Sequence, residues 1–284
     1  MAEIISGKEV AAVLNEGTAA KVAELKNKGI GVSLAVIIVG DDPASKVYVN
    51  NKKKACEKLG ITSYEYVLPE STTQEELMQT VKELNERADV NGILCQLPLP
   101  KHLDSNAVID AIAPEKDVDC FSPTNVGLLN IGRGRFSPCT PAGIMDMLEY
   151  KNISVSGKHC VVIGRSNIVG KPMSALLLAA DATVTVCHSK TQNLKEITKT
   201  ADVLIAAVGR PKFVTADMVK DGAVVIDVGI HRTESGKLCG DVDFDSVEPK
   251  ASYITPVPGG VGPMTIARLM RNTVTAAKLQ NTVE

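Results

Sequence analysis

The sequence lacks long hydrophobic runs and dense blocks of basic residues. The 284 residues carry a formal net charge of -2, so there is no electrostatic footprint for nucleic acid or for an anionic membrane. The longest apolar runs, such as residues 34–39, are far shorter than the ~20 residues that span a bilayer. The opening residues also lack a secretory pattern. We therefore expect a globular, cytoplasmic protein that acts on a small molecule.

Closely spaced metal ligands are also missing. The seven cysteines are scattered singly, with no Cys-x-x-Cys pair and no histidine at metal-ligand spacing. An odd number of cysteines cannot all pair within the chain. They are typical of buried thiols rather than of a zinc site or a redox disulfide, and no metal is expected.

The chain is long enough for about two domains, and its 44% hydrophobic content allows sizeable cores. In the first half, apolar periodicity predicts strands and helices that alternate as a βαβαβ unit, which implies a parallel sheet. The predicted helices are residues 7–27, 44–59 and 74–87, and the predicted strands are residues 34–39, 64–68 and 92–95.

The third strand continues into Gln96-Leu97-Pro98-Leu99-Pro100. Proline has no backbone N–H to donate to a neighbouring strand. The two prolines therefore hold the chain extended beyond the sheet and place Gln96 at its rim. A charged loop at residues 114–121 and a polar connection up to Phe136 are expected next. Thr140 is typical of a helix N-cap, with a linking helix at residues 141–150. We place the domain boundary here, giving domains 1–139 and 140–263.

A second alternation follows the boundary. Cys160 to Ile163 predict a buried strand, Gly164 a tight turn, and Pro172 the first turn of a helix. Free N–H groups at that helix start would bind an anion such as a pyrophosphate. The spacing is Gly-x5-Gly, so an ordinary strand-to-helix turn stays open as the alternative. The further elements are strands 183–187, 203–206 and 224–228, a helix near Leu194, and a last helix at 264–279 that returns to the first domain after the rigid loop 256–263.

The cofactor is predicted from the end of strand 183–187. A site for NAD usually has a carboxylate there for the ribose hydroxyls. This chain instead has His188-Ser189-Lys190, and Arg165 would add a cation from the glycine turn. These residues favour a 2′-phosphate and hence NADP. A solvated strand end is the alternative interpretation of His188 and Lys190.

Tyr48 and Lys52 are four residues apart on a predicted helix, so they share one face. A surface pair is the common interpretation of this spacing. A catalytic pair is the alternative, because Tyr48 lies near a helix start that follows the end of a strand.

Five motifs together resemble the bifunctional methylenetetrahydrofolate dehydrogenase/cyclohydrolase family, and they run in order through essentially the whole chain. They are Tyr48-x-x-x-Lys52, Gln96-Leu97-Pro98-Leu99-Pro100, Lys116-Asp117-Val118-Asp119, the glycine turn from Gly164 to Pro172, and Pro256-Val257-Pro258-Gly259-Gly260-Val261-Gly262-Pro263-Met264-Thr265. The resemblance implies two αβα domains with parallel sheets flanking a cleft, the C-terminal one Rossmann-like and NADP-binding. It also implies a cytosolic homodimer that oxidises methylene-tetrahydrofolate and hydrolyses the methenyl product to the 10-formyl form.

The resemblance also assigns residues. The catalytic lysine is Lys52, its partner tyrosine is Tyr48, the orienting glutamine is Gln96, and the pterin-binding aspartate is Asp119. Further folate contacts fall on Cys95, Leu97, Pro258, Gly259, Gly260, Val261 and Gly262. Cofactor contacts fall on Gly164, Arg165, Ser166, Ile168, Ser189 and Ile230. One departure is Cys120, where the family usually has glycine, so a side chain there could shift Asp119.

The chemistry agrees with these residue types. Loss of hydride from a carbon between two nitrogens needs alignment more than an acid or a base. Hydrolysis needs a proton shuttle, and Lys52 is the candidate if burial and hydrogen bonds from Tyr48 and Gln96 lower its pKa. The alternatives are a dehydrogenase without the hydrolase and a non-catalytic NADP-responsive regulator. A short-chain hydroxy dehydrogenase is disfavoured, because Tyr48 and Lys52 lie outside the domain with the glycine turn.

Overall fold

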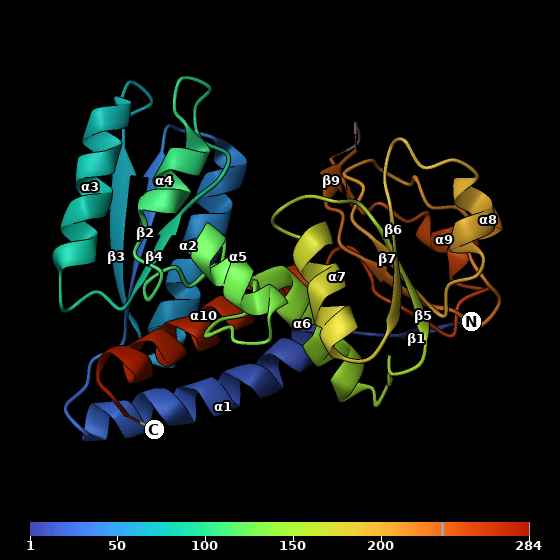
Figure 1. Cartoon of the computed structure of the whole chain (residues 1–284), viewed down its shortest axis with the longest axis horizontal. Helices are drawn as coiled ribbons and strands as arrows, with labels where there is room; N and C mark the ends of the chain where they lie inside the picture. Colours follow the sequence, from blue (N-terminus) through green and yellow to red (C-terminus); the bar gives the residue numbers. More distant parts are fainter. Residues whose placement is uncertain (234–235, 284) are drawn as a thin grey trace. The chain divides into compact units, whose positions relative to one another are not determined.

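The computed structural model describes residues 1–233 and 236–283. It divides into two compact units, each built around a parallel sheet (Figure 1). The three-stranded unit comprises residues 13–139 and 266–284, and the six-stranded unit comprises residues 1–12 and 140–265. Two long helices, α1 (Gly7–Asn27) and α10 (Val261–Gln280), contribute residues to both units. No helix in the described part of the chain is long and apolar enough to cross a membrane.

The three-stranded unit contains the predicted βαβαβ arrangement. Its sheet has the order β3-β2-β4, with all strands parallel. Its elements, besides its parts of α1 and α10, are β2 (Ser33–Val39), α2 (Pro43–Leu59), β3 (Thr62–Leu68), α3 (Gln74–Glu86), β4 (Gly92–Cys95), α4 (Ser105–Ala111) and α5 (Pro123–Asn130).

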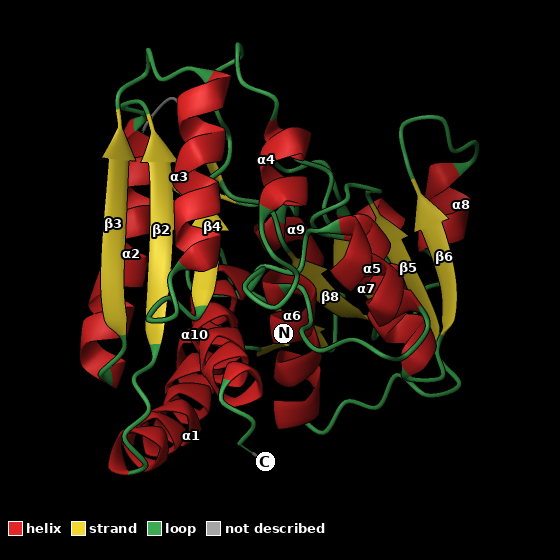
Figure 2. Cartoon of the chain, turned by 60° about the vertical axis from the view of Figure 1, so that its left-hand side comes forward, coloured by secondary structure: helices red, strands yellow, loops and turns green. Residues whose placement is uncertain are grey.

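Alternate residues of β2 build two separate cores. Leu34, Val36 and Ile38 pack with buried residues of α1, α2 and α10. The intervening Ala35, Ile37 and Val39 pack with α3 and α4 on the other face, and Figure 2 shows α2 behind β2 and β3, and α3 in front of β4. Because both faces are covered, the strand is continuously apolar. The prediction that the last helix returns to the first sheet is confirmed.

Two predictions between residues 114 and 150 are wrong. The connection up to Phe136 is not purely irregular, because Ser122 caps helix α5 by accepting a hydrogen bond from the Asn125 N–H. Helix α6 runs from Cys139 to Tyr150, so Thr140 lies inside it rather than at its N-cap. The Thr140 hydroxyl is instead 2.9 Å from the hydroxyl of Thr265. A tertiary contact therefore replaces the expected local cap.

The six-stranded unit has the strand order β1-β11-β8-β7-β5-β6, again all parallel. Besides its parts of α1 and α10, its elements are β1 (Glu3–Ile4), α6 (Cys139–Tyr150), β5 (His159–Ile163), α7 (Gly170–Ala179), β6 (Thr183–Cys187), α8 (Leu194–Thr198), β7 (Val203–Ala206), the 3₁₀ helix η1 (Ala216–Met218), β8 (Val224–Asp227), β9 (His231–Arg232), β10 (Leu238–Cys239), α9 (Phe244–Val247) and β11 (Tyr253–Ile254).

The structure differs from the expected domain limits at the N-terminus. Residues 1–12 belong with 140–265, because β1 pairs in parallel with β11 and extends the larger sheet. Figure 1 shows β1, coloured blue, beside strands from the C-terminal half of the chain. The expected loop at 256–263 is also shorter than predicted, because α10 already begins at Val261.

Candidate functional site

Helix α2 aligns Tyr48, Lys52 and Cys56 at four-residue spacing, and so along one face. The helix begins at Pro43, one residue before the predicted start, and the Asp42 carboxylate caps it by accepting a hydrogen bond from the Ser45 N–H at 2.7 Å. Tyr48 is half-buried, whereas Lys52 is only 8% exposed and Cys56 is fully buried. The pair Tyr48 and Lys52 is therefore not a surface pair.

Lys52 meets Gln96 at the end of the neighbouring strand β4. The ammonium of Lys52 donates to Gln96 Oε1 at 2.8 Å, and Gln96 Nε2 donates to the carbonyl of Leu97 at 2.6 Å. The amide orientation of Gln96 is thus fixed by the chain that follows it. The expected hydrogen bond from Tyr48 to Lys52 is not found between these two described residues.

Burial lowers the pKa of Lys52, and the negative charge of Asp119 opposes this shift. Three thiols also lie near the lysine, those of Cys139, Cys56 and Cys95. Burial raises the pKa of Cys56 and of Cys95 to about 12, so these thiols are neutral at neutral pH. Asp119 therefore provides the negative charge beside Lys52, in surroundings that favour the neutral amine.

Asp119 is partly buried on a loop built by its neighbours. Burial raises the pKa of its carboxyl group, and the charge of Lys52 opposes the rise. The adjacent Asp117 has a different role, since its carboxylate accepts hydrogen bonds from Phe121 N, Ser122 N and Asn125 Nδ2 at 3.2, 2.8 and 2.9 Å. In the motif Lys116-Asp117-Val118-Asp119, Asp117 shapes the loop and Asp119 faces Lys52.

Two further contacts hold the chain on either side of Asp119. Asn272 of α10 donates from Nδ2 to the carbonyls of Val118 and Ser137, at 2.8 and 2.9 Å. Cys120 has a left-handed φ of 62° and is fully buried. Its thiol donates to the carbonyl of Phe136 at 3.5 Å. The side chain that departs from the family pattern is thus accommodated inside the core.

The glycine turn of the six-stranded unit is closely packed. Gly164 has a φ of +129°, and a Cβ added there would lie 2.1 Å from the carbonyl oxygen of Ala207. The prediction of free N–H groups at the helix start is wrong for residues 169–171. Ser166 Oγ accepts from the N–H groups of Val169 and Gly170 at 3.1 and 3.4 Å, and Lys171 N donates to the Ser166 carbonyl. A serine inside the turn therefore satisfies them, and helix α7 begins at Gly170 rather than at Pro172.

The other residues predicted to bind the cofactor follow strands of the same sheet. Arg165, Ser166, Ile168, Ser189 and Ile230 are exposed. Gly164, Ser189 and Ile230 follow the carboxyl ends of β5, β6 and β8, where parallel sheets bind ligands. The strand end after β6 is ordered, because His188 N donates to Thr191 Oγ1 at 2.8 Å and Lys190 N donates to His188 Nδ1 at 3.2 Å.

The loop from Pro258 to Gly262 also belongs to the six-stranded unit. Gly259 has a φ of +102°, and its carbonyl accepts a hydrogen bond from Lys8 N at 3.3 Å. A Cβ on Gly7 would lie 1.8 Å from the carbonyl oxygen of Gly260. The start of α1 and this loop are therefore packed backbone to backbone.

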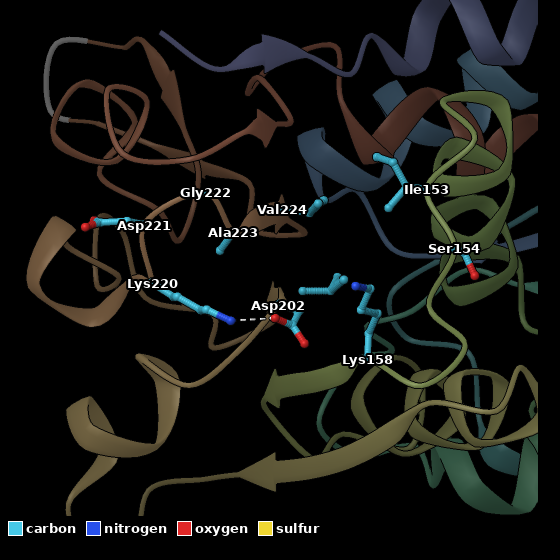
Figure 3. Close-up of a pocket in the computed structure, with 10 residues that line it drawn as sticks. Ile153, Ser154, Lys158, Asp202, Lys220, Asp221, Gly222, Ala223 and Val224 are labelled. Atoms are coloured by element: carbon cyan, nitrogen blue, oxygen red, sulfur yellow. Dashed lines mark hydrogen bonds and ion pairs between the residues drawn. The ribbon is translucent and has the colours of Figure 1, made fainter.

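A hollow of about 220 Å³ lies at the amino ends of the strands of the six-stranded sheet (Figure 3). Its walls include Val203 and Val224, the first residues of β7 and β8, and the ion pair between Lys220 and Asp202 at 2.6 Å. None of the residues predicted to bind cofactor or substrate lines it. The hollow is therefore separate from the carboxyl ends where those residues lie.

Sequence reasoning missed several residues that support the site. They are Asp117, Asn125, Cys139 and Asn272. Asp117 and Asn125 contact each other within one loop, whereas the contacts of Cys139 and Asn272 join distant segments and leave no local pattern. One signal could have been read, since Ser122 followed by Pro123 is a usual helix start. Of the cysteines, all of which lie in the described residues, six are buried free thiols as expected and Cys239 is partly exposed.

Family models match both parts of the chain. The model described as "Tetrahydrofolate dehydrogenase/cyclohydrolase, catalytic domain" matches residues 5–119, and the one described as "Tetrahydrofolate dehydrogenase/cyclohydrolase, NAD(P)-binding domain" matches residues 138–281. The chain belongs to the tetrahydrofolate dehydrogenase/cyclohydrolase family. The resemblance carried by the five motifs is thereby confirmed.

Relatives in this family match over nearly the whole chain. The bifunctional protein FolD of Agathobacter rectalis is 62% identical, and the match covers 98% of this chain and all of that protein. The solved FolD methylenetetrahydrofolate dehydrogenase/cyclohydrolase of Campylobacter jejuni has a TM-score of 0.96 at 52% identity, covering 98% of this chain and 99% of that one. The Trypanosoma brucei enzyme, solved with NADP and an inhibitor, has a TM-score of 0.93 at 40% identity, covering 98% of each chain.

These matches also test the predicted fold and activity. The α/β fold with a C-terminal NAD(P)-binding domain is confirmed, as is a bifunctional dehydrogenase and cyclohydrolase of the family. Neither the dehydrogenase without a hydrolase nor the non-catalytic regulator is favoured. The predicted NADP agrees with the NAD(P)-binding domain and with the NADP complex of the Trypanosoma relative.

Proposed function

We propose that this chain oxidises methylene-tetrahydrofolate with NADP and hydrolyses the methenyl product to 10-formyl-tetrahydrofolate, with Lys52 transferring the proton in the second reaction. The observation that carries the proposal is the buried ammonium of Lys52, bonded to Gln96 at 2.8 Å and facing the charge of Asp119. An exposed lysine is a poor base at neutral pH because its pKa is about 10.4. Burial moves Lys52 toward the range in which a general base works well.

The four catalytic candidates take different parts. NADP, when bound, supplies the acceptor for the hydride. Lys52 accepts a proton from the water that attacks the methenyl carbon, and Gln96 holds the lysine in place. Tyr48 lies one turn earlier on the same face of α2 as Lys52, and Asp119 binds the pterin. Cys95 and Leu97, on either side of Gln96, line the folate.

The pyridine dinucleotide would be held at the carboxyl ends of β5, β6 and β8. The fit rests on the Gly164 turn, which passes so close to the Ala207 carbonyl that it has no room for a side chain. Ser166 and Ile168 extend this turn, and the exposed Arg165 and Ser189 would receive the 2′-phosphate. Ile230 would contact the nicotinamide side. We further propose that residues Pro258 to Gly262 contact the folate.

Lys52→Met tests the assignment of the base, with Lys53→Met as the matched control. Lys53 is the next residue of α2, but its side chain is 45% exposed and paired with Glu65 at 2.8 Å. Lys52→Met should slow hydrolysis of methenyl-tetrahydrofolate by about 10²-fold or more, the usual contribution of a general base. Absorbance of the methenyl compound and of NADPH follows the two steps separately. Normal hydrolysis by Lys52→Met would refute the assignment.

Arg165→Ala tests the choice of cofactor. Turnover should fall chiefly with NADP and little with NAD, because only NADP has the phosphate that this guanidinium would bind. Equal losses with both dinucleotides would contradict the role of Arg165.

Assembly and location complete the proposal. We propose a homodimer formed through β3, one of the two edge strands of the three-stranded sheet, where Val67 is 62% exposed. Sedimentation of Val67→Lys against the unchanged chain tests this, and a dimer that survives the charge would contradict it. A cytoplasmic location accords with seven free cysteines.

A further inference from the structure

The carboxylate of Asp241 joins two loops at the carboxyl end of the larger sheet. Asp241 is fully buried. Its Oδ2 accepts from the N–H groups of Val208 and Gly209 at 2.5 and 3.0 Å, and its Oδ1 accepts from Arg210 N at 3.0 Å. His231 Nε2 lies 2.7 Å from the same Oδ1. Three consecutive N–H groups after β7 and one side chain after β8 therefore bind a single carboxylate.

A second buried carboxylate keeps Asp241 in place. Asp227, the last residue of β8, accepts from Asp241 N, Val242 N and Gly229 N, each at 2.9 Å. Two glycines permit this approach. A Cβ on Gly229 would lie 2.4 Å from Asp241 Oδ1, and a Cβ on Gly240 would lie 1.9 Å from Asp227 Oδ2. The position of Asp241 is thus set by backbone contacts on every side.

Both loops lead directly to residues assigned to the dinucleotide. Val208 follows Ala207, whose carbonyl packs against Gly164 and whose N–H donates to Ile163. His231 follows Ile230, which is 49% exposed. A shift of either loop would move the glycine turn or the nicotinamide side of the proposed site.

We propose that Asp241 is a positioning residue for the dinucleotide, which fixes the loops after β7 and β8 in the shape that binds it. This inference rests on the proposed function. Asp241 itself does not touch the cofactor in this role. It acts through the backbone of residues 208–210 and through His231.

Asp241→Asn tests the proposal, because an amide keeps the shape but cannot accept hydrogen bonds at both ends. Each carboxylate oxygen binds two donors, so either orientation of the amide leaves two donors facing an NH₂ group. Asp202→Asn is the matched control. Asp202 also accepts from a backbone N–H, that of His159 at 2.9 Å, but it lies beside β7 at the amino end of the sheet, in the hollow of Figure 3.

The full chain is titrated with NADP by calorimetry, and both activities are measured. Asp241→Asn should raise the Kd and KM for NADP roughly ten-fold or more, the effect of losing a charge-assisted hydrogen bond. Hydrolysis of methenyl-tetrahydrofolate should stay within about two-fold, because its proposed catalytic residues Lys52, Gln96 and Asp119 lie in the other unit. Asp202→Asn should change neither. An unchanged Kd, or parallel loss of both activities with the fraction of folded protein, would overturn the proposal.

His231 provides the second variant, since its side chain is 20% exposed and the backbone contacts of Asp241 remain without it. His231→Ala should weaken NADP binding several-fold, roughly the effect of one lost hydrogen bond. His231→Gln, which retains a donor, should restore part of it. If Asp241→Asn does not fold, unchanged NADP binding by His231→Ala overturns the proposal. Failure of the unsubstituted chain to bind NADP would instead refute the proposed function.

Discussion

Lys116 offers a sharp test of which charged residues near Asp119 support the fold. Its ammonium donates to the carbonyls of Leu84, Asn85 and Arg87 at 3.1, 2.8 and 2.7 Å. These carbonyls belong to the C-terminal end of α3, where a helix leaves its last carbonyls unpaired. The side chain is buried, and burial lowers its pKa. Lys116 is therefore a cap for α3 rather than a group that reaches the folate.

Lys116→Met keeps the length of the side chain and removes the three hydrogen bonds. Hydrogen bonds to a charged group contribute about 1.5–3 kcal/mol each, but three bonds to one ammonium are not additive. The lost bonds are also offset by relief from burying a charge. We therefore expect the free energy of unfolding to fall by about 3 kcal/mol, close to the usual cost of removing one partner from a buried charged contact.

Urea denaturation measures this loss, with Lys101→Met as the control because Lys101 is exposed. Hydrogen exchange of amides in α3 and β4 locates the effect within the three-stranded unit. The pH dependence of hydrolysis should not move, since Lys116 is not the proposed base. A loss below about 1 kcal/mol, equal to that of the control, would refute the capping role.

Two further predictions concern the surroundings of Lys52. Burial lowers the pKa of Lys52, so hydrolysis should rise with pH over a range below that of an exposed lysine; Asp119→Asn removes the charge that opposes the shift. A pH–rate profile should therefore move to lower pH in that variant, and an upward or absent shift would contradict the assignment. Cys120→Gly relieves about 1 kcal/mol of left-handed strain and loses a small buried side chain of similar value. Its unfolding free energy should change by less than about 1 kcal/mol, and a large loss of either activity would mean that the thiol positions Asp119.

Buried strands were the most predictable part of the fold. The strands Gly92–Cys95 and Val203–Ala206 are buried throughout and have the predicted bounds, because a strand covered on both faces must be continuously apolar. Thr183–Cys187 also has the predicted bounds, although it is a partly exposed edge strand. The two-residue strands β1 and β11 have no such pattern. Their pairing depends on chain segments about 250 residues apart in sequence, which no local window contains.

The candidate site was predictable where the chemistry lies within one element. Tyr48 and Lys52 share a helix face by spacing alone, and Gln96 follows a strand directly. The burial of Lys52 and the bonds of Asp241 could not be derived this way, because they depend on backbone groups brought together by folding. Thr140 shows the opposite error, since a good local cap signal was overruled by its contact with Thr265.

The division of the chain into units affects when each core can form during synthesis and where the chain can be divided. A polypeptide that ends at residue 139 lacks Leu269, Met270 and Val274, which belong to the core beside β2 and α2. One that begins at residue 140 lacks β1. Neither fragment contains a whole unit. During synthesis the core beside β2 and α2 cannot be completed until α10 has emerged, whereas the core of the larger sheet needs residues only up to Ile254. Gene dissection at the apparent domain boundary should therefore yield two incomplete pieces.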